Sequence, residues 1–186
     1  MKRIKVIGIV GPSGSGKDTV AQSLMAHYPD KFHNIITTTT RPKRSYEING
    51  VDYHFVSQED FFKQELLEKT EFRGWYYGTS TESLDVNKVN MGVFNPSAIQ
   101  QLYTLDTIDL IVIKLIVSDK TRLIRQLNRE HNPDVNEIIR RYESDLKDFA
   151  EFDTHFVYGF RFFNETHQDL EFIIQAMDKI LSNFLE

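Results

Sequence analysis

Apolar and polar positions along the chain follow two different periods. Continuous runs of Ile and Val predict buried strands of the parallel type at residues 3–11 and 110–117, and shorter strands are expected at residues 91–95 and 154–160. Apolar residues at a spacing of three or four predict helices. These helices are expected at residues 17–28, 96–102 and 119–130, from Pro133 to about 149, and at residues 165–184. The alternation of strands and helices predicts an α/β fold, a three-layer α/β/α arrangement with a parallel core sheet.

Residues 35–81 interrupt this alternation with shorter, mostly β elements. An Asn-Gly pair at residues 49–50 predicts a hairpin turn, and a short strand is expected to follow it at residues 51–56. Ser57 begins a capping box that predicts a helix, with Leu66 on its apolar face. The sequence therefore predicts a small β-rich region inserted into the α/β core.

A glycine-rich loop separates the first strand from the first helix. It consists of Gly11, Pro12, Ser13, Gly14, Ser15, Gly16, Lys17, Asp18 and Thr19. The pattern GxxxxGK between a strand and a helix is typical of a phosphate-binding loop. Its glycines allow consecutive N–H groups to point inward at the positive end of a helix, and Lys17 adds a mobile positive charge. The loop predicts binding of a nucleoside triphosphate.

Arginines in the inserted region could hold a second phosphate. Arg41 and Arg44 lie three residues apart on a turn that contains proline, and two guanidinium groups can bind a phosphate through paired hydrogen bonds. Tyr53, Tyr77 and Thr79 could add neutral donors. A solvated basic turn explains the two arginines equally well, and a half-buried place on a strand is the more common role of such tyrosines.

A second basic group lies between residues 122 and 141. Arg122, Arg125 and Arg129 share one helix face, and Arg140 and Arg141 follow in the next helix. Arginines on both arms of a helix–turn–helix could close over phosphates and exclude water. A solvated basic face is the simpler interpretation of such a run when it stands alone.

Composition limits the alternatives. The chain has 186 residues, of which 40% are apolar and 26% charged, which suits a single globular domain. The net charge of −5 argues against general nucleic-acid binding. The absence of cysteine fits a reducing cytoplasm, and no apolar run has the length of a signal peptide or a membrane span. The histidines have no metal-ligand spacing.

Several longer motifs resemble those of the guanylate kinase family. They are the GPSGSGK loop, residues 37–44 and 47–57, and Leu67-Glu68 followed by Gly-Trp-Tyr-Tyr-Gly-Thr at residues 74–79. The resemblance is dense over residues 4–81 and looser over residues 118–149, where only the arginine spacing matches. It implies transfer of a phosphoryl group from ATP, as its Mg²⁺ complex, to GMP, which gives ADP and GDP without a covalent enzyme intermediate.

The resemblance also assigns roles to individual residues. The residues implied for the monophosphate are Thr37, Arg41, Arg44, Tyr53, Glu68, Tyr77, Thr79 and Asn95. Those implied for catalysis are Lys17, Arg41, Arg125, Arg129 and Arg141, the last interchangeable with Arg140. It further implies one kinase domain with a core at about residues 1–34, 82–120 and 142–186, a monophosphate-binding region at about 35–81 and a lid at about 121–141.

Two positions depart from the family pattern. Asn95 is our alignment for an aspartate that contacts guanine, and an amide keeps only part of that pairing. Asp18 stands where a Ser or Thr hydroxyl usually meets Mg²⁺, and we predict that its carboxylate supplies charge to the metal. The loop also resembles that of some phage-type deoxynucleoside monophosphate kinases.

Two alternatives to a GMP kinase therefore stay open. One is a deoxynucleoside monophosphate kinase with another base preference, and the other is a non-catalytic guanylate-kinase-like module that binds proteins. The expected partners are small nucleotides, without nucleic acid or membrane, and the sequence leaves a homodimer open.

Overall fold

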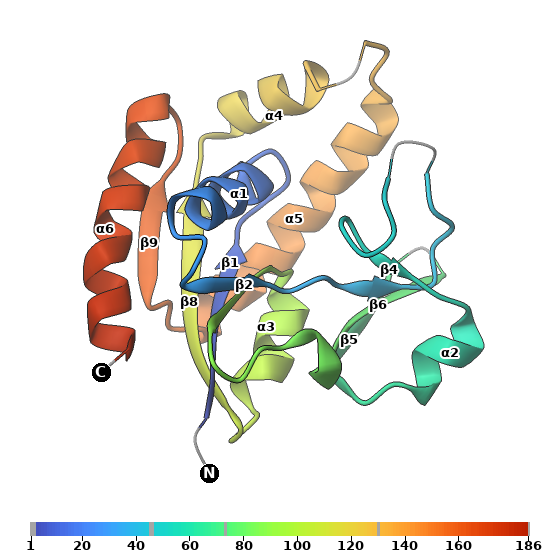
Figure 1. Cartoon of the computed structure of the whole chain (residues 1–186). Coiled ribbons are helices and arrows are strands. Elements are labelled where there is room, and N and C mark those ends of the chain that lie inside the picture. The colour runs from blue at the N-terminus through green and yellow to red at the C-terminus, as the bar shows by residue number, and fades with distance from the viewer. Residues whose placement is uncertain (1–2, 45–46, 73, 130, 186) are drawn as a thin grey trace. The chain divides into compact units, whose positions relative to one another are not determined.

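The computed structural model describes residues 3–44, 47–72, 74–129 and 131–185 (Figure 1). Within it the chain forms two compact units. Unit 1 comprises Met1–Ile7 and Asp30–Leu110, and unit 2 comprises Gly8–Pro29 and Ile111–Glu186. The division into core, monophosphate-binding region and lid that the sequence predicts remains a prediction.

A five-stranded sheet follows the order β2-β7-β1-β8-β9. Its strands are β1 (Ile4–Val10), β2 (Phe32–Asn34), β7 (Val89–Val93), β8 (Ile108–Ile116) and β9 (Phe160–Phe163). In unit 1, β2 pairs in parallel with β7, and in unit 2, β8 pairs in parallel with β9. The continuous Ile and Val runs of β1 and β8 suit strands that are covered on both faces. The predicted α/β class with a parallel core sheet is confirmed.

A second sheet, of four strands, lies within unit 1 in the order β4-β3-β6-β5. Its strands are β3 (Thr38–Thr39), β4 (His54–Phe55), β5 (Leu66–Phe72) and β6 (Trp75–Ser80). The long strands β5 and β6 are antiparallel, and their register shifts between Leu66 and Glu68. This irregularity lies where β5 presents Glu68, a predicted base-binding residue.

Among the helices, unit 1 contains α2 (Gln58–Lys63), a 3₁₀ turn at Thr81–Ser83 and α3 (Pro96–Tyr103). Unit 2 contains α1 (Lys17–His27), α4 (Asp119–Leu127), α5 (Val135–His155) and α6 (His167–Leu185). Helices α2, α3, α4 and α5 begin at side-chain caps that the sequence supplies. Ser57 accepts a hydrogen bond from the Asp60 N–H, as its capping box predicts, and Ser118 accepts one from the Thr121 N–H.

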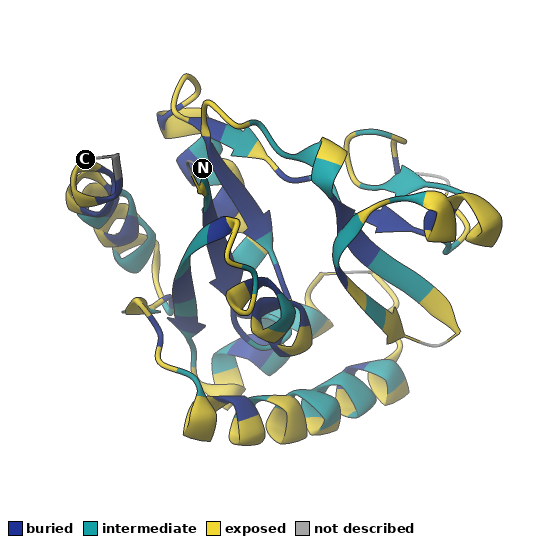
Figure 2. Cartoon of the chain, turned by 90° about the horizontal axis from the view of Figure 1, so that it is seen from below, coloured by how far each residue is buried: buried dark blue, intermediate teal, exposed yellow. Residues whose placement is uncertain are grey.

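Each unit has its own group of fully buried apolar side chains. In unit 1 they include Phe61, Met91, Ile99 and Leu102, and in unit 2 Leu24, Ile113, Leu115, Ile173 and Met177. Figure 2 shows buried residues concentrated on the strands, whereas exposed residues lie along the outer sides of the helices. None of the helices is long and apolar enough to span a membrane, within the ranges that the structure describes.

Two predictions in the inserted region were wrong. Leu66 does not extend a helix, because α2 ends at Lys63 and Leu66 pairs with Ser80 as the first residue of β5. Residues 49–50 form a turn, with Gly50 at φ +78°, but no antiparallel hairpin follows. Instead His54–Phe55 pairs in parallel with β3, because the Asn49 side chain accepts a hydrogen bond from the Phe55 N–H and curls the segment back.

Two boundaries in unit 2 also differ from the predictions. Pro133 is not the first helical residue, because Asp134 caps α5 by accepting from the Glu137 N–H at 3.1 Å. Residues 154–155 belong to α5 rather than to a strand, since the Thr154 hydroxyl donates to helical carbonyl oxygens one turn earlier. The last strand begins only at Phe160, where pairing with β8 starts.

Candidate nucleotide-binding sites

The glycine-rich loop of unit 2 has the backbone geometry of a phosphate cradle. Gly14 and Gly16 adopt φ values of +81° and +86°, in the left-handed region that favours glycine. A Cβ at Gly14 would lie 2.4 Å from the carbonyl oxygen of Arg122, so this position also lacks room for a side chain. Helix α1 begins directly after the loop at Lys17, which leaves its first N–H groups available to an anion.

The side chain of Lys17 folds back onto the glycine-rich loop. Its ammonium group donates to the carbonyl oxygens of Gly11 at 2.7 Å and Pro12 at 3.2 Å. Burial lowers the pKa of Lys17, while the charges of Asp18 and Asp145 act in the opposite direction. In the described contacts, the hydrogen-bond partners of Lys17 are main-chain oxygens. A phosphate can replace these oxygens as the acceptor.

Side chains from later in unit 2 hold the loop from outside. Asn164 donates to the Ser15 carbonyl oxygen at 2.7 Å, and Arg125 approaches the Gly14 carbonyl oxygen at 3.4 Å. Asp145 accepts from the Ser13 N–H at 2.8 Å. The carbonyl oxygens of Gly14 and Ser15 and the N–H of Ser13 are therefore held by side chains that lie more than 100 positions further along the chain.

The predicted lid arginines have different surroundings. Arg125 donates to the carbonyl oxygens of Gly14 and Glu165 and so lies against the phosphate loop. Arg129 is exposed after the end of α4, and its charge lowers the pKa of Lys17, which places it within electrostatic reach of the loop. Arg141 lies one helical turn after Glu137 and is bound to it at 2.7 Å.

Glu137 holds both arginines of α5. Arg140 donates to its carboxylate at 2.8 and 3.1 Å, in addition to the bond from Arg141. These bonds, that from Arg140 foremost, lower the pKa of Glu137 to about 2. Both guanidinium groups thus bind one carboxylate, and phosphate oxygens could compete with that carboxylate for their N–H groups.

In unit 1, Arg41 is fixed by a carboxylate that the sequence did not reveal. Both guanidinium NH groups donate to Glu47, at 2.6 and 3.1 Å, and Glu47 is 6% exposed. Glu47 also accepts from the Arg44 N–H at 2.7 Å. The hydrogen bond from Arg41 holds the pKa of Glu47 below its usual range. Glu47 therefore shapes the turn that carries both arginines.

Aromatic rings complete the surroundings of Arg41. Its guanidinium carbon lies 5.5 Å from the ring centres of both Tyr53 and Phe55. Tyr53 and Tyr77 meet edge to face with 6.0 Å between ring centres. The structure thus brings Arg41, Tyr53 and Tyr77 together, and Arg44 adjoins them through Glu47. Such a group can bind a phosphate with two kinds of donor, guanidinium and phenol.

Glu68 and Thr79 form a buried pair on neighbouring strands. The Thr79 hydroxyl donates to the Glu68 carboxyl at 2.8 Å, and the two residues are only 4% and 1% exposed. Burial raises the pKa of Glu68 to about 7, and the hydrogen bonds from Thr79 only partly oppose this. Thr37 is half-buried directly before β3, and its carbonyl oxygen accepts from the His54 N–H.

Asn95 is engaged in local structure. Its side-chain oxygen caps α3 by accepting from the Ala98 N–H at 2.8 Å, and its amide nitrogen donates to the Thr70 hydroxyl at 3.3 Å. The predicted role in base recognition therefore requires the amide to leave these partners. It stays a prediction, as do the roles of the other site residues.

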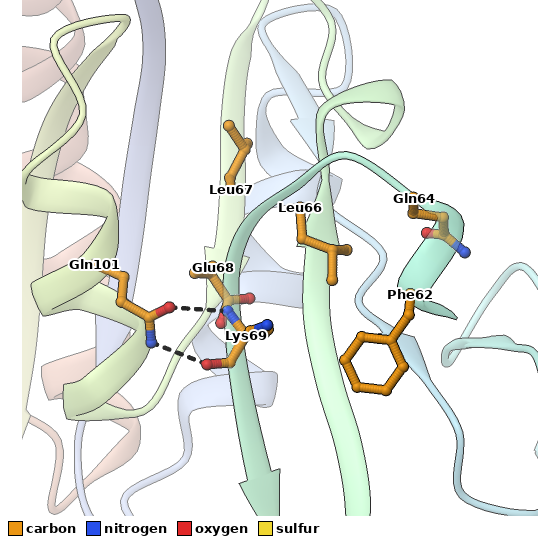
Figure 3. A pocket seen from close by; sticks show the side chains of 7 residues that line it. All are labelled: Phe62, Gln64, Leu66, Leu67, Glu68, Lys69 and Gln101. Carbon is orange, nitrogen blue, oxygen red and sulfur yellow. Dashed lines mark hydrogen bonds between the residues drawn. The ribbon is translucent and has the colours of Figure 1, made fainter. Parts of the chain in front are cut away.

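A pocket of about 270 Å³ lies at the edge of the four-stranded sheet (Figure 3). It is lined by Phe62, Gln64, Leu66, Leu67, Glu68, Lys69 and Gln101. Gln101 of α3 binds both main-chain groups of Lys69, accepting from its N–H and donating to its carbonyl oxygen at 3.0 Å each. Helix α3 thus anchors β5 at the residue after Glu68.

Sequence reasoning missed Glu47, Asp145 and Asn164 as parts of these sites. Glu47 lies within the motif that carries the resemblance, so its proximity to Arg41 and Arg44 was the available signal. Asp145 and Asn164 act on the loop across 132 and 149 positions, and no local pattern marks them.

A glycine-rich loop with its lysine at the start of a helix, in an α/β fold with a parallel sheet, defines the class of P-loop nucleotide-binding proteins. Within that class a family model described as guanylate kinase matches residues 3–177. The chain therefore belongs to the guanylate kinase family, and the resemblance found in the sequence is confirmed.

Individual relatives match parts of the chain. A guanylate kinase of Chlamydia felis is 42% identical over 85 residues, which is 44% of this chain and 42% of the relative. One of a Nostoc species is 42% identical over 92 residues, 47% of this chain and 45% of the relative. Disks large homolog 4 of Danio rerio is 42% identical over 81 residues, 41% of this chain and 10% of the relative. The chain thus spans less than half the length of the curated relatives it matches.

A solved structure resembles nearly the whole fold. The crystal structure of guanylate kinase from Anaplasma phagocytophilum aligns with a TM-score of 0.69 at 20% sequence identity. The alignment covers 98% of this chain and 87% of that one. At this identity the likeness concerns the fold.

Proposed function

We propose that this chain is a nucleoside monophosphate kinase that transfers a phosphoryl group from ATP to GMP or dGMP, giving ADP and the diphosphate. The observation that supports the proposal is that a member of the guanylate kinase family carries two separate groups of side chains whose chemistry suits a phosphate. One is the glycine-rich loop with Lys17, and the other is the Arg41 group with its two tyrosines. A protein that only binds a triphosphate has no need of the second.

In this proposal each group has a distinct task. The loop N–H groups and Lys17 bind the phosphates of ATP, and Arg125, Arg129 and Arg141 neutralise the charge on the migrating phosphoryl group. Arg41, Arg44, Tyr53 and Tyr77 orient the phosphate of the acceptor for in-line attack. We propose that binding of both nucleotides closes the protein around them, since transfer requires exclusion of water.

Base recognition rests on Glu68 in this proposal. Its ionised carboxylate would accept hydrogen bonds from the N1 and N2 edge of guanine, with Thr37 and Thr79 beside the base. The engagement of Asn95 in the cap of α3 favours a second candidate, a deoxynucleoside monophosphate kinase with a different base preference. In that case Glu68 would read the base without Asn95.

Mg²⁺ fits the donor set if most of its ligands come from the nucleotide and from water. No three His, Asp or Glu side chains are gathered as a metal site among the residues that the structure describes. Mg²⁺ commonly binds to proteins through one or two carboxylates plus substrate phosphates, and Asp18 is exposed in the first turn of α1. The metal would neutralise phosphate charge beside Lys17. We also propose that the protein acts in the cytoplasm, and we leave a homodimer open.

A coupled assay of ADP release across GMP, dGMP, AMP, UMP, CMP and dTMP tests the proposal. We expect turnover with GMP or dGMP. Turnover with another base alone would favour the second candidate, and turnover with none would favour a non-catalytic module that binds proteins. Lys17→Ala is expected to lower kcat, whereas Arg41→Ala is expected to raise KM for the monophosphate. Negligible effects of both would contradict the site assignment.

A further inference from the structure

Asp145 connects the long helix α5 to the phosphate loop of the same unit. One of its carboxylate oxygens accepts both from the Ser13 N–H, at 2.8 Å, and from the Arg122 guanidinium, at 3.2 Å. The side chain of Asp145 is 17% exposed and that of Arg122 is 2% exposed, so water competes little for these bonds. Hydrogen bonds of an ionised acceptor are the strong ones, particularly when they are shielded.

Arg122 is fixed by further contacts within the same unit. Its Nε donates to Asp119 at 2.9 Å, and its guanidinium carbon lies 4.2 Å from the ring centre of Tyr142. The Tyr142 hydroxyl donates in turn to Asp119 at 2.9 Å. Helices α4 and α5 are therefore joined by a closed set of bonds around one buried guanidinium. A guanidinium held in this way is not available to a nucleotide, which separates Arg122 from Arg125 on the same helix and from Arg129 just after it.

The arrangement involves more than a junction between two helices. An ion pair could join α4 and α5 without touching the loop, yet here the shared carboxylate oxygen also receives a main-chain N–H of the loop itself. The same part of α4 supports the next residue, because the Arg122 carbonyl oxygen fills the space beside Gly14. Gln126, one turn further, approaches the Ser13 carbonyl oxygen at 3.4 Å.

The negative charge of Asp145 explains why Arg122 lies beside it. A carboxylate beside a triphosphate site would repel the ligand, and unlike charges close by cancel that repulsion. Arg122 supplies the cancelling charge and cannot move away, because Asp119 and Tyr142 hold it. Asp119, the other carboxylate on Arg122, is 60% exposed, so water screens its charge. The loop thus gains a strong hydrogen-bond acceptor whose negative charge is offset by Arg122 at 3.2 Å.

We propose that Asp145 is a positioning residue that fixes the shape of the phosphate loop through the Ser13 N–H, and that Arg122 holds this carboxylate in place and screens its charge from the triphosphate. The proposal deepens the proposed function, on which its kinetic part rests. It also links the loop to α5, the helix that carries Arg140 and Arg141 one to two turns earlier.

Four variants test the proposal: Asp145→Asn, Arg122→Met, the double variant, and Asp148→Asn as control. Asp148 is exposed on the same helix, and its described bond comes from the Ser144 hydroxyl, away from the loop. The first measurement is amide exchange of Ser13 by NMR in the protein without nucleotide. We expect exchange to be about tenfold faster in Asp145→Asn, because an amide oxygen is a weaker acceptor than a carboxylate, and unchanged in Asp148→Asn.

The second measurement is the dissociation constant of ATP with Mg²⁺ by calorimetry, followed by KM values for ATP and GMP. We expect Asp145→Asn to weaken ATP about tenfold and to leave KM for GMP unchanged. Arg122→Met is expected to weaken ATP further, since it leaves the carboxylate unscreened, and the double variant is expected to recover part of that loss.

Other results would overturn the proposal. Tighter ATP binding by Asp145→Asn would make the carboxylate an obstacle to the nucleotide rather than a support of the loop. Unchanged Ser13 exchange, or a double variant no better than Arg122→Met, would contradict the positioning and screening roles. Absence of turnover in the unmodified chain would defeat the proposed function instead, and Ser13 exchange would still decide the role of Asp145.

Discussion

Replacing Glu68 by glutamine is expected to stabilise the folded chain at pH 8 much more than at pH 5. Glu68 is 4% exposed, and burial raises the pKa of its carboxyl from 4.5 to about 7. The folded state therefore binds the proton more tightly than the unfolded state. This stabilisation is fully present below pH 4.5, is lost as the pH rises through 7, and is absent at pH 8, where the buried group is charged.

The size of the effect follows from the two pKa values. One pKa unit corresponds to about 1.4 kcal/mol, so the difference between 4.5 and about 7 is worth roughly 3 kcal/mol in the free energy of unfolding. Part of the change is already complete at pH 5, which leaves about 2 to 3 kcal/mol between pH 5 and pH 8. Glutamine has a similar shape, can still accept from the Thr79 hydroxyl, and carries no charge at either pH.

Urea unfolding of the unmodified chain and of Glu68→Gln at both pH values measures this difference. Thermal unfolding is expected to show a midpoint about 5–10 °C higher for the variant at pH 8. Glu71→Gln, on the exposed part of the same strand, serves as control and is expected to change stability little. An equal effect of Glu68→Gln at pH 5 and pH 8 would refute the reasoning, because a neutral carboxyl would then be no better tolerated than a charged one.

Three further predictions concern the two nucleotide sites. Asp18→Asn is expected to raise the Mg²⁺ concentration needed for half-maximal rate several-fold, and an unchanged Mg²⁺ dependence would exclude the carboxylate from the metal site. Glu47→Gln loosens the paired bonds to Arg41 and is expected to raise KM for GMP about tenfold; a matching rise in KM for ATP would point to general damage instead. Asn164→Ala leaves the Ser15 carbonyl oxygen without its donor and is expected to lower the free energy of unfolding in urea by about 1–2 kcal/mol, so an unaltered midpoint would count against that bond.

The sequence could predict those parts of the fold that depend on local patterns. The phosphate loop requires glycines at fixed offsets before Lys17, and β8 is apolar except at Asp109 and Lys114, so both are visible within a few residues. Leu66 was assigned wrongly because its spacing from the residues of α2 is helical, whereas its state is decided by pairing with Ser80. Strand pairing is a property of two segments, and one segment alone does not reveal it.

The sites were predictable to different degrees for the same reason. Arg41, Tyr53 and Tyr77 belong to motifs that the resemblance covers, and the structure brings them together. Asp145 acts on Ser13 from a helix far along the chain, and a carboxylate on an amphipathic helix is indistinguishable in sequence from a solvated one. The supporting residues of a site are therefore the last to emerge from sequence, although they set its geometry.

The bond pattern of Gln101 has a consequence for the behaviour of the protein in solution. Strand β5 is the last strand of the four-stranded sheet, and the outer edge of such a sheet is a template onto which a foreign strand can add. By accepting from the N–H of Lys69 and donating to its carbonyl oxygen, the Gln101 side chain imitates a neighbouring strand at that point. A single amide thereby occupies the main-chain groups of Lys69, which a foreign strand would otherwise use for pairing.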